Sequence, residues 1–414
     1  MKILKNITVF TMVMLLSVST ILEAREKNIS NFSSSASNLV DSTGTFDGNK
    51  IYADVANNGL FLDYHVSGDS ALEWPKGTGV HSIFQSALWM GATVNGSIRT
   101  IVGDYTQDMG PGPWGGDPLA AVHRIYKVEK SMLASPLDFA DFQEWPVEFG
   151  APWVDVDGDG VYTPLPGGTD HPEFLGDQVL WFVSNDGDPA YKLNFGTSPM
   201  NVEIQTTMFG FDRPDVFGDM VFLKQLVINK GSDDLVDTYM GLWSDPDLGY
   251  AGDDFVGCDV ALGMGYVWND GDDSQYSTLD IGTPAAGYDF FQGPMVPCED
   301  GDSEEVCPTE GAKMFGTRHP GMKNLKMSSF AFYINGDATY TDPSDETEGY
   351  FYLQGLRKDG SAYPAEIAGD LYDQRFCFYG DPNDSAGHST ANPVDGNYAA
   401  SADRRFLMSV GPFT

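Results

Sequence analysis

Short runs of β-branched and aromatic residues, each ended by Gly, Pro, Asn or Asp, constrain the fold of this chain most. Such runs predict strands, because β-branched and aromatic side chains pack well on a pleated surface. The residues between them favour turns. The strands that we expect span residues 178–184, 201–211, 220–229, 237–243, 328–334, 350–356 and 404–410.

The clearest hairpin lies in ALWMGATV-NG-SIRTIVGDY, where Asn95 and Gly96 supply the two positive-φ residues of a two-residue turn. Helix signals are scarce. The best is SPLDFADFQEW, with Ser135 as N-cap, Pro136 at the first helical position and Asp138 in the first turn. We therefore predict an all-β fold, mainly antiparallel and sandwich-like, with long Asp/Gly-rich loops and little helix.

The N-terminus has the pattern of a secretory signal peptide. Lys2 and Lys5 precede a short apolar run over residues 7–22, and Ala24 follows as a small residue for cleavage. The run is too short for us to favour an uncleaved anchor, and no later segment of the sequence could cross a bilayer. The expected parts are a signal peptide at 1–24, a flexible Ser/Asn-rich leader at 25–48, and β-rich parts at 49–200 and 201–414.

The net charge of -37 excludes nucleic acid as an expected partner, since no cationic patch of useful size can form. With 42% hydrophobic and 13% aromatic residues, the chain is expected to fold rather than to remain disordered. Its acidity fits two readings, general solubility or clustered carboxylates that collect cations. The spacing of the aspartates decides between these two readings.

The stretch DVDGDGVYTP at residues 155–164 has the aspartate spacing of a calcium loop, with Gly160 at the sharp turn. An EF-hand would have a bidentate Glu where this chain has Pro166, and no helix is expected to follow. Three neighbouring carboxylates repel one another unless a cation neutralises them, so we favour a structural calcium turn over a solvated acidic turn. The expected ligands are Asp155, Asp157, Asp159 and Val161, with the remaining oxygens from Asp170, Glu173 or Asp177.

A second acidic stretch, WSDPDLGYAGDDFVGCD, is an equally open choice between a calcium site and a solvated loop. The strings SNDGD and WNDGDD are more typical of hairpin turns that hold no ion. The ligands expected from the second stretch are Asp245, Asp247, Asp253 and Asp254.

Four cysteines in an exported chain predict two disulfides, although the sequence leaves three connectivities open. We favour a Cys298–Cys307 bond, which would close the acidic loop CEDGDSEEVC, and by elimination a Cys258–Cys377 bond. Zinc is not expected, because the chain has no CxxC pair and no HExxH motif.

Catalytic signatures are mostly absent: the chain has no GxSxG elbow and no Walker loop, and the prolines of GPGPWG make that stretch a turn. Glu144, Glu148 and Glu173 lie beside aromatics and could serve a glycosidase, but chance pairings are expected among 60 acidic residues. We therefore assign no catalytic residue. Most tryptophans lie within predicted strands, and Trp114, in a Gly/Pro loop, is the one expected to be exposed.

Several stretches taken together are familiar: GVHSIFQSALWMGATVNG, DVDGDGVYTP, GDQVLWFVSNDGD, VINKGSDDLVDTYMGLWSDPDLGYAGDDFVGCD, AGYDFFQGP and RRFLMSVGPFT. Over about residues 50–414 this set resembles an uncharacterised family of large secreted proteins from Bacteroidetes-like bacteria. Members typically continue past the GPFT element and end in an immunoglobulin-like domain or a C-terminal sorting domain read by the type IX secretion system. No such domain follows here, which is what a fragment of a longer protein would show. The resemblance implies export and calcium, and no known activity.

The sequence thus predicts a secreted or cell-surface, calcium-stabilised β-rich protein with a structural, adhesive or ligand-binding role. The partners that we expect are glycans or cell-envelope components. The alternative is a secreted polysaccharide-active enzyme that uses paired carboxylates.

Overall fold

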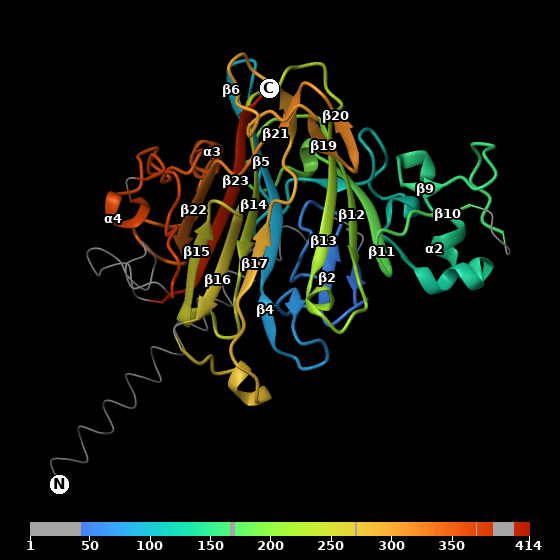
Figure 1. The fold of residues 1–414 in the computed structure, drawn as a ribbon, viewed down its shortest axis with the longest axis horizontal. Coiled ribbons are helices and arrows are strands. Elements are labelled where there is room, and N and C mark those ends of the chain that lie inside the picture. Colours follow the sequence, from blue (N-terminus) through green and yellow to red (C-terminus); the bar gives the residue numbers. More distant parts are fainter. Residues whose placement is uncertain (1–42, 166–169, 270, 370, 384–400) are drawn as a thin grey trace, which may run out of the picture. The chain divides into compact units, whose positions relative to one another are not determined.

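Antiparallel strands dominate the computed structural model of the chain, which describes residues 43–165, 170–269, 271–369, 371–383 and 401–414 (Figure 1). The predicted all-β class is confirmed. The predicted signal peptide lies outside the described residues. Within them, no helix is both long and apolar enough to span a membrane.

A five-stranded sheet in the order β22-β23-β14-β5-β6 runs through the centre of the fold. Its strand β14 pairs with β5 on one side and with β23 on the other, so strands far apart in sequence lie side by side (Figure 1). The predicted Asn95-Gly96 turn joins β5 to β6, with φ angles of 51° and 80°. The strands are β5 (Gln85–Val94), β6 (Ser97–Ile101), β14 (Val236–Asp245), β22 (Ser329–Ile334) and β23 (Arg404–Phe413).

A second five-stranded sheet has the order β13-β12-β11-β7, and β8 also pairs with β11. The boundary that the sequence suggested near residue 200 falls between β11 and β12, which pair with each other over eight residues. The strands are β7 (Gly110–Pro111), β8 (Tyr126–Glu129), β11 (Gln178–Asn185), β12 (Val202–Gly210) and β13 (Val221–Asn229).

A four-stranded sheet, β1-β2-β3-β4, begins inside the segment predicted as a flexible leader. The leader was expected to reach residue 48, but residues 43–46 already form β1, and Phe46 is fully buried. The strand forms because its aromatic end joins the apolar core rather than remaining in solvent. The strands are β1 (Thr43–Phe46), β2 (Tyr52–Ala56), β3 (Leu72–Glu73) and β4 (His81–Ile83).

Smaller sheets complete the β structure. The three-stranded sheet contains β15 (Asp254–Asp259), β16 (Met264–Asn269) and β17 (Ala286–Asp289). The two-stranded sheets pair β9 (Trp153–Val154) with β10 (His171–Pro172), β18 (Met295–Pro297) with β21 (Met322–Asn324), and β19 (Ala312–Met314) with β20 (Thr317–His319).

The two five-stranded sheets share an apolar core. Leu88 and Met90 on one face of β5 join the same core as Val202 and Ile204 of β12. Alternate residues of the central sheet point to its other face. There Trp89 of β5 stacks on Trp243 of β14, with 5.9 Å between the ring centroids. Both faces of the central sheet are therefore buried.

The strand predicted at 350–356 is wrong, because those residues belong largely to helix α3 (Glu346–Leu353). Asp345 caps this helix by accepting hydrogen bonds from the amides of Thr347 and Glu348, a capping signal that outweighs the β propensity of the aromatic run. Helix α3 packs closely on the central sheet. A Cβ atom at Gly91 would lie only 2.6 Å from the Tyr350 ring.

The helix predicted near Ser135 is present only in fragments. Residues Pro136–Asp138 form one 3-10 turn, and α2 (Ala140–Gln143) adds one short helix. The Ser135 side chain makes no capping hydrogen bond. A further short helix, α4, spans Ala365–Ala368.

A buried lysine anchors the connection between β11 and β12. The Lys192 Nζ lies 3.5 Å from a carboxylate oxygen of Asp108 and 3.8 Å from one of Asp186, and it donates to the Thr100 carbonyl on β6. Burial raises the pKa of both carboxyl groups, although Lys192 and backbone amides act against that rise. The single ammonium group of Lys192 thus offsets the charge of two buried carboxylates.

We expect Lys192→Met to lower the free energy of unfolding by about 3–5 kcal/mol, because it leaves two buried carboxylates without their cation. The measurement is urea unfolding of the variant and the parent protein. As a control, Lys127→Met removes the partner of Asp47 in a partly exposed pair and should cost less than about 1 kcal/mol. Equal losses in the two variants would contradict the role given to Lys192.

Candidate metal centres

The loop between β9 and β10 brings four carboxylates together. Asp155 follows β9 directly and Asp170 precedes β10, so pairing of Val154 with His171 closes the loop on itself. One carboxylate oxygen from each of four aspartates lies within 4.8 Å of the others; these are Asp155, Asp157, Asp159 and Asp170. The three aspartates of the DxDxDG stretch are exposed, whereas Asp170 is buried.

Backbone amides of the loop point at these carboxylates. Asp155 accepts from Gly158 at 2.7 Å and from Gly160 at 3.0 Å, and both glycines have positive φ. Asp170 accepts from the amides of Thr163 at 2.8 Å and Val156 at 2.9 Å. The hydrogen bond from Thr163 is the largest influence that lowers the pKa of Asp170. The loop therefore wraps its backbone around the acidic group.

Crowding of like charges is visible at Asp157. An amide hydrogen bond from Asp159 acts to lower its pKa, but desolvation and the neighbouring carboxylates of Asp159, Asp170 and Asp155 raise it overall. Hard oxygen donors in a glycine-containing loop are the ligand type that calcium takes. The residues present therefore fit a calcium ion.

The structure selects among the residues expected to complete this site. Of the three candidates, Asp170 joins the cluster. Glu173 instead lies 3.8 Å from Lys224, and Asp177 accepts a hydrogen bond from the amide of Asp212. Val161 remains in the loop, where its amide donates to a carboxylate oxygen of Asp159.

A second acidic group lies where β14 ends and β23 begins. One carboxylate oxygen each from Asp245, Asp247 and Asp403 lies within 4.8 Å of the others. Asp245 and Asp247 were expected as ligands from the sequence. Asp403 was missed, because a single aspartate before a distant strand carries no local signal.

The remaining predicted ligands of this stretch have other hydrogen-bond partners. Asp253 accepts from the Asn269 side chain at 2.6 Å. Asp254 is the first residue of β15, and one of its oxygens accepts from the amide of Leu248 at 3.2 Å. Burial raises the pKa of Asp254 to about 10.

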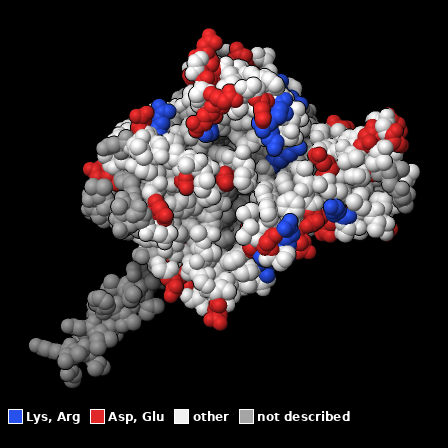
Figure 2. Space-filling view, in the orientation of Figure 1, with Lys and Arg blue, Asp and Glu red and all other residues white. Residues whose placement is uncertain are grey.

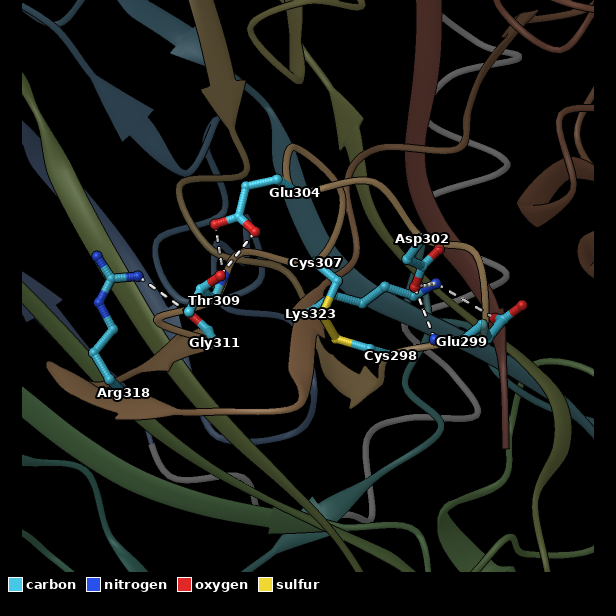
Figure 3. The surroundings of a disulfide bond; sticks show 9 residues. All are labelled: Cys298, Glu299, Asp302, Glu304, Cys307, Thr309, Gly311, Arg318 and Lys323. Carbon is cyan, nitrogen blue, oxygen red and sulfur yellow. Dashed lines mark hydrogen bonds and ion pairs between the residues drawn. A yellow bond between two sulfur atoms is a disulfide. The ribbon is translucent and has the colours of Figure 1, made fainter.

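The predicted Cys298–Cys307 disulfide is present, with a Cα–Cα distance of 5.9 Å. It closes an acidic loop in which three of the carboxylates have nearby partners (Figure 3). The ammonium of Lys323 lies 2.9 Å from Asp302 and 3.4 Å from Glu299, as Figure 3 shows. The net negative charge of this loop is thus partly neutralised by a lysine from β21.

The predicted Cys258–Cys377 disulfide is not formed. Both cysteines are buried free thiols, and the Cys258 Sγ faces the backbone carbonyl of Cys377 at 3.4 Å instead of its sulfur. Burial raises the pKa of both thiols, which keeps them in the unreactive protonated form. Pairing by elimination failed because a buried cysteine also packs well as a small apolar residue.

The carboxylates considered for glycosidase chemistry do not converge on a described cavity. Glu144 pairs with Arg124 at 2.8 Å, and the adjacent Trp145 is buried, so its ring is not available to stack on a sugar. Glu173 pairs with a lysine of β13. These pairings favour a structural role for both glutamates.

One cavity of about 330 Å³ lies beside the predicted exposed tryptophan. Trp114 is 44% exposed, and its indole nitrogen donates to the Asn201 side chain at 3.1 Å. The ring packs on Gly187, where an added Cβ would lie only 2.6 Å from it. The cavity is lined by Gly110, Trp114, Gly115, Gly116, Pro118, Asn185, Gly187, Asp188, Pro189 and Tyr191.

No protein-family model, curated protein or solved structure matches this chain, so its sites are interpreted from their own residues.

Replacing Cys298 and Cys307 together by serine should lower the free energy of unfolding by about 2–3 kcal/mol, because the denatured chain regains the freedom of a loop of about ten residues. Urea unfolding without reductant measures the loss. Dithiothreitol should reproduce it in the parent protein and leave the double variant unchanged. An unaffected parent protein would contradict this stabilising role.

Proposed function

We propose that this protein is a calcium-stabilised, β-rich protein of the cell surface or medium with a structural, adhesive or ligand-binding role. The observation that carries the proposal is the convergence of the four carboxylates in the β9–β10 loop. An ion held there would brace a fold rather than transmit a signal, because the loop joins two strands and is not followed by a helix.

Charge balance supports an ion in this loop. Among the ion pairs of the described residues, none joins a lysine or arginine to Asp155, Asp157, Asp159 or Asp170. Backbone amides supply partial positive charge only. A divalent cation would remove the mutual repulsion of the carboxylates and hold Asp170 to the DxDxDG turn.

Two further features support action outside the cell. The N-terminal sequence has the pattern of a signal peptide, and a disulfide such as Cys298–Cys307 persists in oxidising compartments. On the face that Figure 2 shows, acidic side chains form separate groups among uncharged residues, and basic side chains lie beside some of these groups. Such a surface attracts cations.

Calcium should raise the melting temperature of the protein, and EDTA should reverse the rise. For a Kd of about 0.1 mM, as in extracellular calcium modules, about 10 mM calcium adds about 2.7 kcal/mol to the free energy of unfolding. Differential scanning calorimetry measures the shift. Asp155→Asn should abolish most of it, whereas Asp234→Asn, which changes an exposed carboxylate outside the cluster, should preserve it.

An Asp155→Asn variant that responds to calcium as the parent protein does would remove this loop from the proposal. An unchanged melting temperature in both proteins would remove calcium stabilisation altogether.

Of the structural, adhesive and ligand-binding roles, the cavity at Trp114 favours ligand binding. An exposed indole beside a cavity with polar groups matches the surface on which sugar rings stack, and Asp188 adds a carboxylate to the rim. Of the carboxylates considered for catalysis, none lines this cavity. We therefore propose glycan capture without turnover at Trp114, in preference to the enzyme.

Trp114→Ala should weaken retention on immobilised plant and marine polysaccharides about 10-fold or more, since loss of one stacked aromatic removes about 1.5 kcal/mol. Affinity electrophoresis in gels that contain each polysaccharide measures retention. Phe291→Ala, which removes an exposed ring outside the cavity, is the matched control and should bind normally. Equal retention of both variants would contradict the assignment, and release of reducing sugar would favour the enzyme.

A further inference from the structure

The second acidic group differs from the β9–β10 loop because it lies in the interior of the fold. Asp245, the last residue of β14, is 1% exposed, and Asp247 is also buried. Asp403 is partly buried and immediately precedes β23. The three carboxylates therefore come from one stretch after β14 and from a second stretch that precedes the last described strand.

Several polar atoms in this region are buried without a partner. Among the described residues, the Oδ1 atoms of Asp245 and Asp254 make no hydrogen bond, and neither polar atom of the Gln85 side chain makes one. All three residues are at most 1% exposed. Buried polar atoms nearly always have a partner, because losing hydration without replacing it costs free energy. These atoms indicate a group that they bind.

The unpartnered atoms point to the same region as the three carboxylates. Gln85 is paired directly opposite Asp245 in the ladder of β5 and β14, which places the two side chains on the same face with Cβ atoms about 5 Å apart. Asp254 is close enough that the carboxylates of Asp247 and Asp403 contribute to raising its pKa. The backbone carbonyl of Asp254 also accepts from the amide of Ala402, next to Asp403.

Among the described residues of this group, acidic side chains outnumber basic ones. Arg405 lies 3.1 Å from Asp245 and 2.8 Å from Asp403, and the Tyr105 hydroxyl donates to Asp245 at 2.7 Å. The guanidinium of Arg404 is the second cation near this group, and it interacts electrostatically with Asp254. Among the described residues, these two guanidinium groups face four carboxyl groups in a buried region. The nearby Asp342 and Asp253 add negative charge rather than remove it.

We propose that Asp245, Asp247 and Asp403 bind a second calcium ion, with Asp254 and the Gln85 amide oxygen as further ligands. The inference rests on the proposed calcium-stabilised function and adds a site at a different place in the fold. A divalent cation would be a partner for the buried oxygens of Asp245, Asp254 and Gln85 that make no hydrogen bond among the described residues. Calcium fits better than magnesium, because magnesium retains waters and takes only one or two protein carboxylates.

An ion at this position would hold together two neighbouring strands and a third that is distant from them in sequence. Asp245 ends β14, Asp254 begins β15 and Asp403 precedes β23. The loop from 246 to 253 and the entry into β23 would then be fixed by one centre. The first site, in contrast, braces only the local β9–β10 loop.

Isothermal titration of the full chain with calcium, after removal of bound metal by EDTA and dialysis, tests the inference. The parent protein should bind two equivalents. Asp155→Asn should bind one, through the loss of the first site, and Asp247→Asn should bind one, through the loss of the second. Asp234→Asn should bind two. Near-ultraviolet circular dichroism checks that each variant is folded, and Asp403→Asn replaces Asp247→Asn if the latter is not.

The outcomes separate the two proposals. One equivalent in the parent protein that Asp155→Asn removes and Asp247→Asn retains would overturn the second site, and would mean that its carboxylates are protonated instead. One equivalent that only Asp247→Asn removes would overturn the first site and support the second. No binding by the parent protein would overturn both.

Discussion

Pairing of β14 with both β5 and β23 is the interaction on which the rest of the structure depends. It joins strands from the beginning, middle and end of the described chain into one sheet. Because both faces of that sheet are covered, its central residues must be apolar or fully partnered. Trp243 meets the requirement, since its indole nitrogen donates to the Tyr333 hydroxyl. Asp245, two residues further on, meets it only in part.

Three groups of carboxylates in the described residues have their charge compensated in three different ways. At Asp108 and Asp186 the compensation is a buried lysine of the same chain. In the β9–β10 loop it comes from backbone amides, together with the ion that we propose. At the end of β14 one arginine bridges Asp245 and Asp403, and polar atoms remain unpartnered. A strongly acidic chain can thus keep a compact interior only where each cluster has a source of positive charge.

The proposed roles occupy separate parts of the fold. The cavity at Trp114 lies beside β7 and the end of β11, and none of its lining residues belongs to either carboxylate cluster. Sites for ions and a site for a ligand can therefore be altered independently. This separation is expected of a protein in which metal ions hold a scaffold and a surface ring contacts the partner.

The sequence by itself determined what depends on a few neighbouring residues. The Asn95-Gly96 hairpin, most of the long strands, the DxDxDG turn and the short Cys298–Cys307 loop follow from backbone preference and short separation, which no distant contact has to supply. The partial exposure of Trp114 belongs to the same class, because Gly112 and Gly115 beside it have positive φ and favour a turn there.

Only the tertiary structure decided which distant residues meet. Asp403 joins Asp245 because β23 pairs with β14, and nothing near Asp403 in the sequence encodes that choice of partner. The aromatic run at 350–356 became a helix because Asp345 caps it and the central sheet offers glycines for it to pack on. Cys258 and Cys377 come close and remain thiols, since proximity alone does not orient two sulfur atoms for a bond. Local preferences are set within a few residues of the chain, whereas such encounters depend on how all the strands pair.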